Sequence, residues 1–159
     1  MYKHTSKAQG FTLIEILVVI GIIAVLAAIV IIAINPARQF AQSRNSQRGA
    51  NAQTILDGIG QRLADNKGVF AGGTPNCPTL TANTVYSITN TSGASNIDLS
   101  CLTPTYIPTA LPFDPSVAGA HWTSATDYDT KYSVEVDANG RFTVSAPGAE
   151  IGTTITLTR

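Results

Sequence analysis

The chain has 159 residues, with ten basic and ten acidic side chains, so its formal net charge at pH 7 is zero. This length fits one small domain and one membrane stem. It is too short to bury a long, wholly apolar helix inside a soluble core, and the sequence contains such a helix near its N-terminus.

The apolar run covers residues 16–34, which are 19 residues without a charged or hydrogen-bonding side chain. At a rise of about 1.5 Å per residue, a helix of this length spans roughly 28 Å, close to the hydrocarbon thickness of a bilayer. Because the run is apolar on every face, it has no polar side to offer water. The stretch 10–34 therefore predicts a membrane-spanning helix.

Glu15 is the one carboxylate inside this apolar block. An ionised group costs roughly 2.5–3.5 kcal/mol at the bilayer centre and less near its ends. One interpretation is a side chain that snorkels to the nearer interface, although the Glu stem reaches less far than that of Lys or Arg. The other is a cationic partner inside the membrane. Since no Lys or Arg lies between residues 8 and 37, only a new chain terminus, made by a cut after Gly10, could supply that charge from this stretch.

The string GFTLIE, from Gly10 to Glu15, follows a short basic leader and precedes the long apolar run. In this it closely resembles the class III signal of type IV pilins and pseudopilins. The resemblance is strong over residues 1–67 and covers the rest only in general plan. It implies that a prepilin peptidase removes residues 1–10 by cutting between Gly10 and Phe11, and that it methylates the Phe11 amine. It also implies that Glu15 pairs with the Phe11 amine of a neighbouring copy during assembly.

The same resemblance implies a structural subunit of a bacterial type IV pilus or pilus-like filament. The chain would wait as a single-pass inner-membrane protein and then enter an extracellular helical homopolymer, with help from a platform protein and an assembly ATPase. Charge alone leaves the orientation open: Lys3 and Lys7 favour a cytoplasmic N-terminus, whereas three arginines after the span oppose it. The resemblance places the N-terminus in the cytoplasm and the head outside. The alternatives are a pseudopilin of a type II secretion system and a DNA-uptake pilin.

Residues 35–67 predict an amphipathic helix that continues the stem. Proline removes a helix hydrogen bond, so a kink or local loosening is expected at Asn35-Pro36. The apolar residues of the helix fall on one stripe: Ala52, Leu56, Ile59 and Leu63, with Ile55 beside it. Gly68 is expected to cap the C-terminal end. The stripe is interpreted as the face on which the head packs.

The head, residues 68–159, begins with a Gly-, Pro-, Thr- and Asn-rich loop at 69–84. Strands are expected at 85–88, 97–99, 132–136, 142–144 and 153–158, with a turn at 137–140. The last three strands are expected to form an antiparallel sheet that covers the helix stripe. The predicted fold class is therefore α+β, with a long N-terminal helix, membrane-spanning in 11–34 and amphipathic in 35–67, under a small antiparallel sheet.

Cys77 and Cys101 are the only cysteines, and both lie in the head that the resemblance places outside the cell. In an oxidising compartment such a pair predicts a disulfide, although two free buried thiols are the alternative. A bridge that closes a loop of this length stabilises a small domain by about 3–4 kcal/mol in the chain-entropy model.

The sequence shows no catalytic constellation, Gly-rich phosphate motif or zinc spacing. Neither an enzyme nor a cofactor is therefore expected. His121 is interpreted as a loop residue. Asp127 and Asp129 bracket Tyr128 and suggest a calcium loop as one alternative, but Ca²⁺ takes about six to eight oxygen ligands. A solvated acidic loop without a metal is the favoured interpretation.

The charges are unevenly distributed, with a net +3 in residues 35–67 and −4 in residues 68–159. Charge complementarity between stacked copies is one interpretation, and a solvated surface is the other. Arg38, Arg44 and Arg48 could face lipid headgroups, neighbouring copies or the phosphates of DNA. Nucleic-acid binding is the less favoured of these, because no aromatic residues are interleaved with the arginines.

Overall fold

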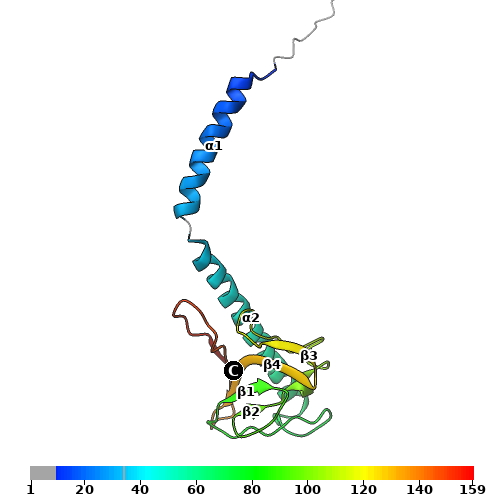
Figure 1. Cartoon of the computed structure of the whole chain (residues 1–159). Helices are drawn as coiled ribbons and strands as arrows, with labels where there is room; N and C mark the ends of the chain where they lie inside the picture. The colour runs from blue at the N-terminus through cyan, green and yellow to red at the C-terminus, as the bar shows by residue number, and fades with distance from the viewer. Residues whose placement is uncertain (1–9, 34) are drawn as a thin grey trace, which may run out of the picture. The chain divides into compact units, whose positions relative to one another are not determined.

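The computed structural model describes residues 10–33 and 35–159, so the expectations for the leader before Gly10 fall outside the described residues. The chain divides into two compact units, Met1–Gln39 and Phe40–Arg159, and each is described by itself (Figure 1). The whole is an α+β arrangement of two helices and one sheet, as the sequence predicts.

Helix α1, Leu13–Ala33, is 21 residues long and contains one charged residue, Glu15. Its large apolar side chains are all at least half exposed, because nothing in the described residues of this unit packs around them. The segment Leu13–Ile32 is long and apolar enough to cross a membrane. These side chains need an apolar surrounding, so the helix is consistent with membrane insertion.

At Asn35-Pro36, where a kink or local loosening was expected, one helix has ended and a second helix begins. Helix α1 ends at Ala33 and α2 runs from Pro36 to Asp65. Pro36 occupies the first helical position, where its missing N–H matters least. Asn35 caps the new helix: its side-chain Oδ1 accepts a hydrogen bond from the Arg38 backbone N–H at 3.2 Å.

Helix α2 turns its apolar stripe into the core of the head, which confirms the prediction for that face. Ala52, Ile55 and Ile59 are each at most 1% exposed. At the C-terminal end, the Gly68 N–H donates to the Leu63 carbonyl at 2.7 Å. Gly68 therefore takes part in the cap, and both Lys67 and Gly68 have positive φ values, of 56° and 85°.

The sheet has six strands in the order β2-β1-β4-β5-β6, with β3 also paired to β4. Their bounds are β1 Tyr86–Thr89, β2 Asn96–Ile97, β3 His121–Ser124, β4 Asp127–Val136, β5 Phe142–Ser145 and β6 Thr156–Thr158. The expected antiparallel pairing of β4, β5 and β6 is confirmed, and the register sets Val134 opposite Val144. The sheet as a whole is mixed, because β1 and β2 run parallel. Their short pairing buries Ile88 and Ile97 side by side in the core.

Strand β4 begins five residues earlier than expected, and it pairs with β3, which was expected to be a loop (Figure 1). Inward-facing residues explain both differences. Tyr128 and Thr130 alternate with polar residues and are at most 1% exposed, and Trp122 packs on Tyr128 with ring centroids 4.7 Å apart. Asp127 and Asp129 are therefore outward positions of a strand, and the expected acidic loop is wrong.

A disulfide joins Cys77 to Cys101, with Cα atoms 5.4 Å apart. Cys77 is 2% exposed and belongs to the core cluster between α2 and the sheet. Within the 69–84 loop, the one isolated β-bridge joins Gly72 and Cys77. Because the loop has little other regular pairing, the disulfide is an important link between the loop and the core.

Candidate assembly site and the ion-pair cluster of the head

The segment before α1 is exposed at the bond where the sequence predicts a cut. The Phe11 side chain is 83% exposed. Among the described residues, no atom apart from those of Gly10 and its chain neighbours lies within 4 Å of the place where a Cβ on Gly10 would sit. The Gly10–Phe11 peptide bond therefore lies in open space in this unit.

Glu15 is tied to Thr12 by a capping box, which is the pattern Ser/Thr-x-x-Glu at a helix start. Its Oε2 atom accepts hydrogen bonds from the Thr12 backbone N–H and from the Thr12 hydroxyl, both at 2.8 Å. In return, the Glu15 backbone N–H donates to the Thr12 hydroxyl at 3.3 Å. Two N–H groups at the start of α1 are thus satisfied by side chains.

This capping role was missed at the sequence level, although the spacing Thr12-Leu-Ile-Glu15 carries its signal. A carboxylate in the first turn also interacts favourably with the positive end of the helix dipole. Among the residues that the structure describes, the second carboxylate oxygen, Oε1, takes part in no hydrogen bond and Glu15 in no ion pair. The Thr12 contacts thus fix the side chain and leave one oxygen for a further donor.

In the head, Arg48 lies at the centre of an ion-pair cluster formed by Arg44, Arg48, Asp114 and Glu150. Both Arg48 and Asp114 have side chains with no exposed surface. All five N–H donors of the Arg48 guanidinium have acceptors: two on Asp114, one on Glu150 and the side-chain oxygens of Asn45 and Ser116, at distances from 2.7 to 3.0 Å.

Arg44, one turn before Arg48 on α2, completes the cluster. Its Nε and Nη2 donate to the two carboxylate oxygens of Glu150 at 2.7 and 2.8 Å. Hydrogen bonds from Arg44 and then Arg48 hold the pKa of Glu150 at about 2, well below its usual value. Burial raises the pKa of Asp114, but hydrogen bonds from Arg48 and from the Ser116 backbone outweigh it, so that pKa is also lowered.

These contacts revise the interpretation of the stem arginines. Arg44 and Arg48 bind carboxylates of their own head, so neither side chain is directed at lipid headgroups or nucleic acid. The complementarity between a basic stem and an acidic head therefore acts within one chain at these two positions. Arg38 is exposed.

Arg62 is the second fully buried arginine of α2. Its Nε donates to the Phe70 carbonyl at 2.8 Å, its Nη2 donates to the Gly72 carbonyl, and its guanidinium carbon lies 5.8 Å from the centre of the Phe70 ring. The arginine thereby fastens the start of the long loop to the helix. No sequence pattern marked this role, because both acceptors are backbone atoms.

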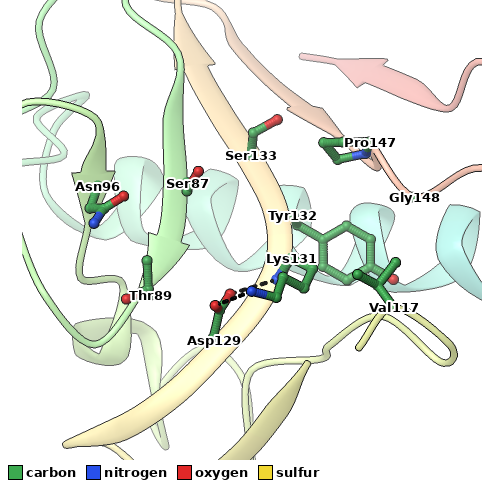
Figure 2. Close-up of a pocket in the computed structure, with 10 residues that line it drawn as sticks. All are labelled: Ser87, Thr89, Asn96, Val117, Asp129, Lys131, Tyr132, Ser133, Pro147 and Gly148. Carbon is green, nitrogen blue, oxygen red and sulfur yellow. Dashed lines mark hydrogen bonds and ion pairs between the residues drawn. The ribbon is translucent and has the colours of Figure 1, made fainter. Parts of the chain in front are cut away.

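Asp127 and Asp129 of β4 each have a basic side chain nearby. Asp127 lies 3.2 Å from His121 Nε2, and Asp129 pairs with Lys131. Hydrogen bonds to the Gly119 carbonyl and to Asp127 raise the pKa of His121. Figure 2 shows Lys131 turned towards Asp129 at a surface cavity of about 530 Å³. Within residues 10–33 and 35–159, no group of three or more His, Cys, Asp or Glu side chains is arranged to hold a metal ion.

Residues 5–34 match the family model described as prokaryotic N-terminal methylation motif. The match contains Gly10, Phe11 and Glu15, as well as the whole of α1, and it ends before α2 begins. No curated protein and no solved structure matches the chain. The family match thus rests on the N-terminal segment.

Proposed function

Because the chain is a precursor with the class III signal of type IV pilins and pseudopilins, we propose that it is the structural subunit of a bacterial type IV pilus or pilus-like filament. In this proposal a prepilin peptidase cuts between Gly10 and Phe11 and methylates the new amine. The mature chain, which begins at Phe11, is then assembled by a platform protein and a cytoplasmic ATPase into a surface filament of identical copies.

The observation that carries the proposal is Glu15, a single carboxylate in a helix that is otherwise apolar on every face. Thr12 satisfies one of its oxygens, and no described residue neutralises its charge. The amine that a cut would create on Phe11 supplies the missing positive charge. Pairing with the amine of an adjoining copy would use the free oxygen and leave the capping box intact, because the Thr12 backbone N–H survives the cut.

Charge pairing is needed because apolar burial gives these helices little preference for one another. In a bilayer, lipid tails already surround the side chains of α1, so transfer into a filament core removes no water from them. Packing between helices and the Phe11–Glu15 pair therefore have to guide the register. The exposed side chains of α1, from Leu13 to Ile32, would form the filament core.

The test separates the charge of Glu15 from its capping role. Glu15→Gln keeps an oxygen that can accept from Thr12, since Glu and Gln both serve at this position of a capping box, but it removes the negative charge. The matched control, Thr12→Val, breaks the side-chain half of the box and keeps the charge. Both variants should insert in the membrane as the wild type does.

We expect Glu15→Gln to lose surface filaments and Thr12→Val to retain most of them, as counted by electron microscopy and by the amount of subunit sheared from cells. Normal filaments from Glu15→Gln would contradict the charge pair. Loss in Thr12→Val alone would show that helix capping, and not charge, is what assembly requires.

A pseudopilin of a type II secretion system and a DNA-uptake pilin would use the same N-terminal site. They differ from the proposed pilus in the location of the filament and in whether the filament moves secreted protein or DNA. Mass spectrometry of filaments sheared from the cell surface distinguishes the pilus from the secretion pseudopilus, because a pilus subunit is the main component there, whereas a secretion pseudopilus stays in the periplasm.

A further inference from the structure

Two exposed apolar features lie at opposite ends of the head. One is the turn at residues 150–153, between β5 and β6. The other is a cavity of about 320 Å³ where α2 ends. We propose that, in the filament, the Ile151 side chain of one copy enters this cavity in the next copy. The proposal rests on the filament function proposed above and names the contact between heads that such a filament uses.

The turn presents Ile151 in an unusual backbone conformation. The Thr153 N–H donates to the Glu150 carbonyl at 3.2 Å, and both central residues, Ile151 and Gly152, have positive φ values of 54° and 65°. Two positive φ values are typical of a type I′ turn, in which Asn, Asp or Gly is favoured at both central positions. A β-branched residue is strained there, and this one is also half exposed to water. Neither folding nor solubility of the single chain explains an isoleucine at this position.

Contacts with α2 hold the turn in place, so the position of Ile151 is fixed relative to the helix. The amide of Asn45 binds both backbone groups of Glu150, donating to its carbonyl at 2.8 Å and accepting from its N–H at 2.9 Å. The Glu150 carboxylate binds Arg44 and Arg48. Figure 1 shows the chain before β6, in the faded red of the C-terminal end, beside the first half of α2. A rigid contact loses less entropy on binding than a mobile one.

The cavity at the other end is mainly apolar. Its large apolar lining residues are Leu63, Val69, Phe70, Leu80, Val136 and Phe142. Val69 is 58% exposed at its edge. A volume of about 320 Å³ is at the lower end of the range of about 300–1,000 Å³ found for ligand pockets, which suits one side chain and its turn.

The positions of the two features suit a helical polymer. Asn45 and Leu63 are 18 residues apart on α2, which corresponds to about 27 Å along the helix. A contact between two different patches of the same chain is heterologous, and it produces open helical assemblies when the rotation between copies does not close a ring. A second copy is therefore the occupant that fits both the apolar turn and the cavity.

The test uses disulfide trapping in filaments assembled by the full chain in cells. The double variant Ile151→Cys/Val69→Cys places a thiol on the turn and another at the cavity. The matched control is Ile151→Cys/Val85→Cys, because Val85 is also 58% exposed but does not line the cavity. The native cysteines are already bridged. Mild oxidation of filaments is followed by non-reducing electrophoresis.

We expect a ladder of covalent multimers from the Val69 pair and none from the Val85 pair or from either single variant. Dimers from Ile151→Cys alone would show a symmetric contact and overturn the proposal. So would filaments of the Val69 pair that form normally and give no ladder, which would leave the pilus function standing. If the wild-type chain forms no filaments at all, the proposed function fails, and this inference fails with it.

A second variant separates assembly from folding. Ile151→Gly removes the side chain and relieves the positive φ, so the head should unfold at the same or a higher urea concentration than the wild type. We expect it to form about tenfold fewer filaments, the scale expected for loss of one buried aliphatic contact. Filament numbers equal to those of the wild type would overturn the proposal.

Discussion

Removing the carboxylate of Asp114 tests whether the buried part of the ion-pair cluster holds the head together. In Asp114→Ala, two of the five Arg48 donors lose their acceptors, and the guanidinium stays buried with no exposed surface. The backbone N–H groups of Ser116 and Val117, which donate to Asp114 at 2.9 and 2.8 Å, lose theirs as well.

The expected loss of stability follows because Asp114 is the fully buried anionic partner of Arg48, and without it the buried guanidinium keeps only the partly exposed Glu150 as a counter-charge. Breaking a buried ion pair by removing one partner typically costs about 3–5 kcal/mol. A small domain is stable by about 5–15 kcal/mol in total, so the variant loses a large part of its margin. With a urea dependence of about 1–3 kcal/mol per molar, the unfolding midpoint should fall by roughly 2 M.

The assay is urea unfolding of the full chain in detergent micelles, followed by tryptophan fluorescence. Trp122 is the only tryptophan and packs on Tyr128 in the head, so its signal reports the head alone. The matched control is Arg44→Met, which removes a cation whose side chain is 35% exposed and leaves Glu150 bound to Arg48. A partly exposed pair contributes less than a fully buried one, so its midpoint should fall less than that of Asp114→Ala.

A further variant separates the loss of the buried counter-charge from the loss of the hydrogen bonds to Ser116 and Val117. In Arg48→Met/Asp114→Ala no charge remains buried at this place, and we expect a smaller loss than in Asp114→Ala alone. If Asp114→Ala shifts the midpoint no more than Arg44→Met does, the buried pair is no stronger than a surface pair and the reasoning is wrong.

Two other predictions concern the head. The pKa of Glu150 is lowered from 4.5 to about 2 on folding, so its stabilising effect is complete above pH 4.5 and is lost as the pH falls towards 2. The urea midpoint of the wild type should therefore fall over this window, and the fall should be smaller in Glu150→Gln; an identical fall in both would contradict this assignment. For the glycines of α2, Gly49→Ala should raise the midpoint, because the new Cβ meets no atom within 4 Å and alanine favours a helix by about 1 kcal/mol. Gly58→Ala should lower it, because its Cβ would lie 2.9 Å from the Ile107 side chain and overpacking costs about 1–3 kcal/mol; a gain in both variants would refute the close approach.

Periodicity explains which parts of the fold the sequence could predict. The apolar run of α1, the stripe that includes Ile55 and Ile59, and the β4–β5 hairpin each carry their pattern within a few residues, and the structure confirms them. Strand β3 has no such pattern, because two of its four residues are Thr and Ser. It forms because the Trp122 ring packs against the Tyr128 ring on β4.

Long-range pairing explains what the sequence did not reveal. Arg48 is separated from Asp114 by 66 residues and from Glu150 by 102, so nothing local marks these partners. Seen alone, Arg44 and Arg48 are cations of a stem that could face lipid or phosphate. The Thr12–Glu15 capping box is different, because the spacing of the two residues is visible in the sequence. The free-energy cost of a carboxylate in the membrane pointed instead to a cationic partner, so the local contact with Thr12 was not predicted.

The most direct test of the central claim is the mass and N-terminal residue of the mature protein purified from its native host. The proposed pilin-like processing requires a chain that begins at Phe11 and carries one added methyl group on its amine. We expect that mass in sheared filaments. A chain that begins at Met1, keeps its unmodified leader and remains a monomer would contradict both the role of Glu15 and the filament function.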